Sequence, residues 1–176
     1  MSAHRGQPLP RSLVRPVDAS VFLNEKHTPK RANVAQYQAL RAPWQRPELI
    51  YLAQASARLQ VSSPHAETSQ TLAQAISALQ RWVLQNHQDA QAWQVLATAL
   101  AAQGRPLASL RAEGEAQLAR MDFGAAVDRF RAAQDTSRQL PTHLRDHIEA
   151  AIVDARLRHA QGLLREQMME RQERGN

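Results

Sequence analysis

The sequence contains no cysteine among its 176 residues. This absence excludes disulfides, thiolate nucleophiles, cysteine-based zinc sites and iron–sulfur clusters. It does not identify a compartment, because a chain without cysteine is compatible with a reducing or an oxidising environment.

Runs of β-branched and aromatic residues, which are the usual signal for strands, are also missing. Aromatic residues make up 5% of the chain and there are only 6 glycines, whereas Ala, Leu, Gln and Arg are abundant. Alanine and straight-chain residues lose little conformational freedom in a helix. Because 43% of the residues are hydrophobic, we predict an all-α domain with a core of its own.

No apolar run approaches the roughly 18 residues that a membrane-spanning helix requires, so we expect no membrane span. The first 20 residues contain Arg5, Arg11 and Arg15 but no continuous apolar core, so no secretory signal peptide is visible. The residues alone therefore leave the localisation unknown.

The net charge of +6 is concentrated at the start of the chain. Residues 1–46 contain eight basic and two acidic side chains, whereas residues 47–176 contain fourteen of each. Six of the nine prolines lie in the first 47 residues, and proline interrupts helices. We therefore predict that residues 1–46 form a disordered, largely irregular basic tail, with room for one short helix near 32–40.

From residue 47 onward, apolar residues recur at the three- and four-residue spacing of amphipathic helices. We expect Asp89 and Asp122 to cap the helices that follow them, and Gly104 to end a helix in the left-handed conformation. The pattern is interrupted at residues 63–64, 86–89, 104–106, 121–122 and 141–142, and these five breaks predict six helices.

Each expected helix carries one apolar stripe, which we predict to be its buried face. Trp82 and Trp93 accompany these stripes, so we expect them to fill the core and not to anchor a bound peptide. The predicted stripes, helix by helix, are Leu49, Leu52, Ser56 and Leu59; Leu72, Ile76, Leu79 and Val83; Trp93, Leu96, Ala97 and Leu100; Leu107, Leu110, Gly114, Leu118 and Met121; Phe123, Ala126, Val127, Phe130 and Ala133; and Leu144, Ile148, Ile152 and Ala155.

Very short turns force neighbouring helices to lie antiparallel. Residues 47–165 are therefore predicted to form three stacked helical hairpins, followed by a polar C-terminal tail at 166–176. The alternation of small and large residues favours a tetratricopeptide (TPR)-like right-handed solenoid over an ordinary amphipathic hairpin stack. The helix at 106–121 would have to serve two overlapping repeats. The best TPR-like match is Gly114, Asp122, Phe123, Ala126, Phe130 and Ala133.

The stretch 93–134, WQVLATALAAQGRPLASLRAEGEAQLARMDFGAAVDRFRAAQ, and the later stretch 147–158, HIEAAIVDARLR, resemble one family. They look like the C-terminal TPR region of periplasmic zinc metalloproteases of the β-barrel-assembly-enhancing type. These proteases belong to the same metallopeptidase family as the CAAX-prenyl proteases. The resemblance covers about residues 48–165. It implies a periplasmic accessory domain that holds substrate or components of the outer-membrane assembly machinery.

The chain lacks the H-E-x-x-H helix that supplies the zinc ligands and the general base of such proteases. The stretch most similar to this motif is HAETS at 65–69, and it does not match. We therefore predict no catalytic residues, no metal, no cofactor and no small-molecule substrate. The expected partner is a protein or an extended polypeptide, such as a protease domain or an outer-membrane assembly component. The alternative is a fragment of, or a subunit acting with, an active zinc metalloendopeptidase.

Two histidines, His143 and His147, are four residues apart and would share a helix face. A zinc site would need a third protein ligand, and the nearby candidates are Asp154 and His159. The amides exposed at the start of a helix also disfavour an imidazolium. We therefore predict two solvated histidines and no metal site.

If the TPR register holds, polar side chains of mixed charge line the groove side of the helices. We predict that these residues bind an extended polypeptide through amide and ionic contacts. Arg111/Glu115 and Asp154/Arg158 are also spaced as local i,i+4 ion pairs. The predicted groove residues are Gln91, Gln94, Thr98, Arg111 and Glu115.

The basic tail raises nucleic-acid binding as a further alternative. Its charges are scattered, with no run of five or six and no aromatic interleaving apart from Trp44 between Arg41 and Arg46. We therefore expect a solubilising tail and no specific nucleic-acid partner.

Overall fold

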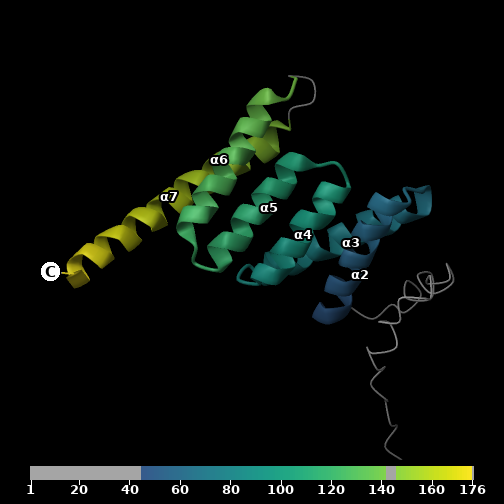
Figure 1. Cartoon of the computed structure of the whole chain (residues 1–176), viewed down its shortest axis with the longest axis horizontal. Helices are drawn as coiled ribbons and strands as arrows, with labels where there is room; N and C mark the ends of the chain where they lie inside the picture. The colour runs from purple at the N-terminus through teal and green to yellow at the C-terminus, as the bar shows by residue number, and fades with distance from the viewer. Residues whose placement is uncertain (1–44, 142–145, 176) are drawn as a thin grey trace, which may run out of the picture. The chain divides into compact units, whose positions relative to one another are not determined.

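The computed structural model describes residues 45–141 and 146–175. Within these ranges the chain is helical and contains no strand, which confirms the prediction of an all-α fold. Residues 1–44 of the expected basic tail, with its short helix near 32–40, lie outside the described residues, as do His143 and Leu144. Arg46, which was assigned to that tail, is instead the first residue of a helix. The helices are α2 (Arg46–Ser62), α3 (Ala66–Gln85), α4 (Ala90–Ala102), α5 (Pro106–Ala119), α6 (Phe123–Gln139) and α7 (His147–Gly175) (Figure 1).

The helix boundaries follow the local signals in the sequence. The carboxylate of Asp89 accepts a hydrogen bond from the backbone N–H of Ala92 at 3.1 Å, and Asp122 accepts one from Ala125 at 3.0 Å. Gly104 has a φ of 77°, which is the left-handed conformation predicted for the end of α4. The two expected caps and the expected glycine turn are therefore confirmed.

The helices pack in two groups of three, which we call the first and second triads. In the first triad α2, α3 and α4 all contact one another, and in the second α5, α6 and α7 do so. The triads meet where α4 packs against α5, and Figure 1 shows these two helices side by side. Among the described residues α3 does not contact α5 and α4 does not contact α6. A regular stack of three equivalent hairpins is therefore not confirmed.

Helix α5 serves both triads because it has two apolar faces. Ala108, Ala112 and Ala116 recur every four residues and pack into the core of the first triad. The larger side chains Leu107 and Leu118 lie on another side and pack against residues of α6 and α7. The sequence pattern had required this helix to belong to two overlapping repeats, and in the structure it packs against both triads.

Gly114 and Phe130 set the separation of α5 and α6. Phe130 is completely buried, and a Cβ atom added to Gly114 would lie 2.6–2.9 Å from three atoms of its ring. The ring therefore occupies the space that a side chain at position 114 would need. This contact matches the small and large positions assigned to these two residues from the sequence.

The predicted stripe of the last helix is wrong. Ile148 is 77% exposed and Ile152 39% exposed, and Ala155 is exposed as well. The buried face of α7 carries Val153, Leu157 and Ala160 instead, because these residues pack against α5 and α6. Both faces carry apolar residues at helical spacing, so the sequence pattern did not distinguish the buried one.

Three further boundaries and positions differ from expectation. Met121, assigned to a stripe, is 72% exposed at the end of its turn, where its φ is 61°. Helix α7 begins at His147, after the expected start at 141–142. It then continues through Gly175, whereas the pattern had predicted that it would fade into the polar C-terminal tail at 166–176. Residues 165–175 are mostly exposed, so their helical form was not visible as an apolar stripe.

Candidate interaction surfaces

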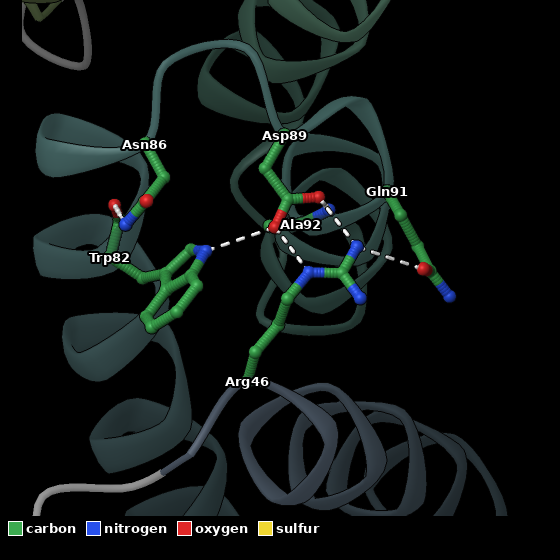
Figure 2. A network of polar contacts seen from close by, with 6 residues as sticks. All are labelled: Arg46, Trp82, Asn86, Asp89, Gln91 and Ala92. Carbon is green, nitrogen blue, oxygen red and sulfur yellow. Dashed lines mark hydrogen bonds and ion pairs between the residues drawn. The ribbon is translucent and has the colours of Figure 1, made fainter.

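The densest polar cluster joins the start of α2 to the turn between α3 and α4 (Figure 2). Arg46 donates two hydrogen bonds to the carboxylate of Asp89, from Nε at 2.6 Å and from Nη2 at 2.8 Å. Trp82 donates its indole N–H to the same carboxylate at 3.0 Å. Nη2 of Arg46 also donates to the side-chain oxygen of Gln91 at 3.0 Å. We call these four residues, Arg46, Trp82, Asp89 and Gln91, the α2–α4 clamp.

The electrostatics of the clamp stabilise the ionised form of Asp89. Hydrogen bonds from Arg46, which have the largest effect, and from the amide of Ala92 and the indole of Trp82 together lower the pKa of Asp89 to about 2, against the opposing effect of burial. A carboxylate with this pKa is ionised throughout the physiological range. It is therefore suited to hold helices together and not to transfer protons.

An open hollow of about 400 Å³ lies beside the clamp. Its lining is polar and rich in side-chain amides, and it contains neither a nucleophile paired with a base nor a group of metal ligands. Asp89 was predicted as a cap, but its pairing with Arg46 was not, because the two residues are 43 positions apart and Arg46 had been assigned to the tail. The hollow is lined by Arg46, Trp82, Gln85, Asn86, His87, Gln88 and Asp89.

Three of the predicted groove residues share one side of α4. Gln91 and Thr98 are exposed and Gln94 is partly exposed. Gln91 receives the hydrogen bond from Arg46 in the clamp, and the hydroxyl of Thr98 donates to the carbonyl of Gln94 at 3.1 Å. The structure thus brings these residues together on a polar strip, whose role in binding stays a prediction.

The other two groove residues are covered by α7. Arg111 pairs with Glu149, and Glu115 accepts from Nε of Arg156 at 2.6 Å and from its Nη2 at 2.5 Å. Glu115 is only 8% exposed, so this bidentate pair lies inside the second triad. Arg111 and Glu115 therefore hold α5 and α7 together and do not extend the polar strip of α4.

The local ion pairs expected from i,i+4 spacing are wrong for the same reason. Arg111 and Glu115 each pair across to α7 and not with one another. Asp154 accepts a hydrogen bond from the side-chain amide of Gln134 on α6 at 2.8 Å, and no ion pair joins it to Arg158 among the described residues. Packing α7 against α5 and α6 brings these interhelical partners closer than the local ones.

Of the two histidines considered as metal ligands, His143 lies outside the described residues. His147 and His159 are exposed, and Asp154, the other candidate ligand, is bonded to Gln134. In the part of the chain that the structure describes, no three His, Asp or Glu side chains are grouped as metal ligands. No helix in that part is both long and apolar enough to cross a bilayer.

The largest departure from expectation is the solvent-facing side of α7. Ile148, Ala151, Ile152 and Ala155 are all exposed there, on a helix whose opposite face is buried. Ile148, Ile152 and Ala155 belong to the stripe that was predicted to be the buried face of this helix. Its exposure makes it a candidate binding surface of the second triad.

Comparison of the chain with models of protein families, with characterised proteins and with solved structures finds no match. The resemblance to the TPR region of periplasmic zinc metalloproteases therefore stays an expectation. What can be said of function rests on the surfaces described above.

Proposed function

We propose that the helical body is a non-catalytic protein-binding module, an accessory domain of the TPR-like kind that holds a protein or an extended polypeptide. The observation that carries this proposal is the apolar outer side of α7, where Ile148 is 77% and Ile152 39% exposed. Burying one such side chain against a partner contributes about 1.5–3 kcal/mol.

Two further features support the proposal. The polar strip of Gln91, Gln94 and Thr98 on α4 carries amide and hydroxyl groups that suit the backbone of an extended polypeptide. The α2–α4 clamp and the buried pair Glu115–Arg156 hold the helices in a defined arrangement, so these groups are preorganised before binding.

The resemblance to the accessory part of a zinc metalloprotease suggests the kind of partner. A protease domain or a component of the outer-membrane assembly machinery is the first to test, and a periplasmic location is part of the same proposal. The basic residues 1–46 would add a salt-sensitive increment to binding, because their charges act at long range.

The test is capture of proteins from lysate with and without nuclease treatment. The full chain is compared with residues 1–44 alone and with a chain that begins at Gln45, which retains Arg46 of the clamp. We expect the full chain and the chain that begins at Gln45 to retain the same proteins at high salt. Capture by residues 1–44 alone at high salt, or capture that disappears with nuclease treatment, would place the function in the basic segment instead.

A further inference from the structure

One continuous line of side chains runs along the solvent side of α7, and we call it the outer seam. Its members are separated by three or four residues, so they lie within about a third of the circumference of the helix. All of them are exposed except Gly162, which is partly exposed. The outer seam consists of Ile148, Ile152, Ala155, His159, Gly162, Glu166, Glu170 and Glu173.

The two ends of the outer seam differ in chemistry. The first end is apolar, because Ile148, Ile152 and Ala155 follow one another there. The second end carries three exposed carboxylates along the seam, at residues 166, 170 and 173, whereas the exposed arginines of the same stretch, Arg165, Arg171 and Arg174, lie outside the seam. Among the described residues, their one ion pair joins Glu170 to Arg174 at 3.8 Å, with both side chains largely exposed, so it neutralises little of this charge.

Like charges four residues apart destabilise a helix, so Glu166 and Glu170 oppose the helical form of this end. The structure nevertheless keeps α7 helical through Gly175. A cationic partner along the seam would relieve the repulsion, and apolar side chains of the same partner would cover Ile148 and Ile152. Ala155 and Gly162 lie between the two ends, and their small size lets another helix approach closely.

We propose that the outer seam docks an amphipathic helix of another protein, with apolar side chains against residues 148–155 and lysine or arginine against residues 166–173. This proposal rests on the proposed function and specifies its surface and its partner. The spacing of three or four residues is the geometry in which side chains of two helices interlock at a shallow crossing angle.

A second copy of the chain fits the outer seam poorly. Parallel pairing would place each carboxylate opposite its own equivalent, and like charges across an interface are unfavourable. Antiparallel pairing with an offset would place Glu166 against Ile148 and bury a charge in an apolar contact. Antiparallel pairing of the apolar ends alone would leave the three carboxylates without a cation from the second copy, and within the described residues only Glu170 has one on its own helix. The charge pattern therefore favours a partner with a basic end.

The test measures binding of designed helical peptides of about three heptads to the full chain. One peptide carries leucine at the seam positions of one half and lysine at those of the other, and its matched control has glutamate in place of lysine. Each peptide is made in both orders along the chain, because the helix could run in either direction. We expect the better lysine peptide to bind at least tenfold more tightly than its glutamate control, with a difference that shrinks at high salt.

Variants of the chain locate the site. The triple variant E166K/E170K/E173K should reverse the preference between the peptides, and I148D/I152D should abolish binding of both. L84D is the matched control, because Leu84 is 80% exposed on α3 and should leave binding unchanged. The substituted side chains are exposed, and circular dichroism checks that each variant folds. If I148D/I152D fails to fold, the proposal is tested by the triple lysine variant alone, which should reverse the preference between the two peptides.

Equal binding of the lysine and glutamate peptides, or seam variants that bind like the wild type, would overturn the outer-seam proposal. The proposal would also be overturned if sedimentation showed a dimer that dissociates in the I148D/I152D variant and neither peptide bound. That result would identify a second copy of the chain as the partner. If proteins captured by the full chain are unaffected by the seam variants, the proposed function stands and the seam is the wrong surface. If the chain captures no protein and binds no peptide, both proposals fail.

Discussion

The contact between Gly114 and Phe130 determines how closely two helices approach. Gly114→Ala would place a Cβ atom within 2.6–2.9 Å of the Phe130 ring, so we expect a loss of about 1–3 kcal/mol in the free energy of unfolding. Gly162→Ala is the control, because no atom lies within 4 Å of the added Cβ and alanine favours the helix.

Urea denaturation followed by circular dichroism measures both changes. Phe130→Leu should recover part of the loss in the Gly114→Ala background, because a smaller side chain makes room for the added methyl group. An unchanged midpoint for Gly114→Ala would show that α5 and α6 are not in the contact described.

The ionisation of Asp89 makes the free energy of unfolding depend on pH in the acidic range. Its pKa is lowered from 3.8 to about 2 in the folded chain, chiefly by Arg46. The lowered pKa stabilises the folded state in full above about pH 4, and this contribution is lost as the pH falls through the folded value. With allowance for solvent screening, we expect it to be about 1–2 kcal/mol.

The measurement is thermal unfolding between neutral pH and the lowest pH at which the chain stays soluble. Asp89→Asn should flatten the acid side of the profile, and Arg46→Leu should flatten it in the same way because it removes the main cause of the shift. Profiles that coincide with the wild type in both variants would argue against the clamp.

Among the elements, α7 is joined to α5 by two interhelical ion pairs. Glu115 and Arg156 form a bidentate pair in which the Glu115 side chain is only 10% exposed. We expect a double-mutant cycle with Glu115→Ala and Arg156→Ala to give a coupling energy of about 1–3 kcal/mol. Either single change leaves a charge without its partner, which is why each should destabilise the second triad.

The matched control is Arg138 with Asp135, an i,i+3 pair on α6 whose side chains are 67% and 63% exposed. Its coupling should stay below about 0.5 kcal/mol, because water screens exposed pairs. Equal coupling energies for the two cycles would mean that burial in the second triad does not strengthen the interhelical pair.

At the scale of the whole molecule, the prediction concerns catalysis. Because the chain lacks an H-E-x-x-H helix, we expect the purified full-length protein to show no proteolysis and no stoichiometric zinc. Metal analysis by mass spectrometry and a casein cleavage assay check this. About one zinc per chain, lost in the His143→Ala/His147→Ala variant, would contradict the prediction and revive the metallopeptidase alternative.

The whole molecule also shows why the repeat signal was ambiguous. The sequence matched TPR spacing on both sides of residues 106–119, and in the structure this helix, α5, packs its alanines on one triad and its leucines on the other. A pattern of small and large residues describes how one helix meets its neighbours. It does not determine how those neighbours are arranged around one another.

The sequence by itself determined the local features of this protein. The all-helical fold, the caps at Asp89 and Asp122, the left-handed Gly104 and the small position at Gly114 could all be predicted. Each depends on residues within a few positions along the chain or on the periodicity of a single helix, so its physics is contained in a short stretch of sequence.

Only the tertiary structure decided which side chains from distant parts of the sequence contact one another. Asp89 pairs with Arg46 across 43 positions, Arg111 with Glu149 across 38, and Glu115 with Arg156 across 41. It also decided which of the two apolar stripes of α7 is buried, because that choice depends on the shape of α5 and α6 beneath the helix. Partners are settled by packing between distant segments, and where one helix carries two apolar stripes, periodicity along that helix does not determine which stripe is buried.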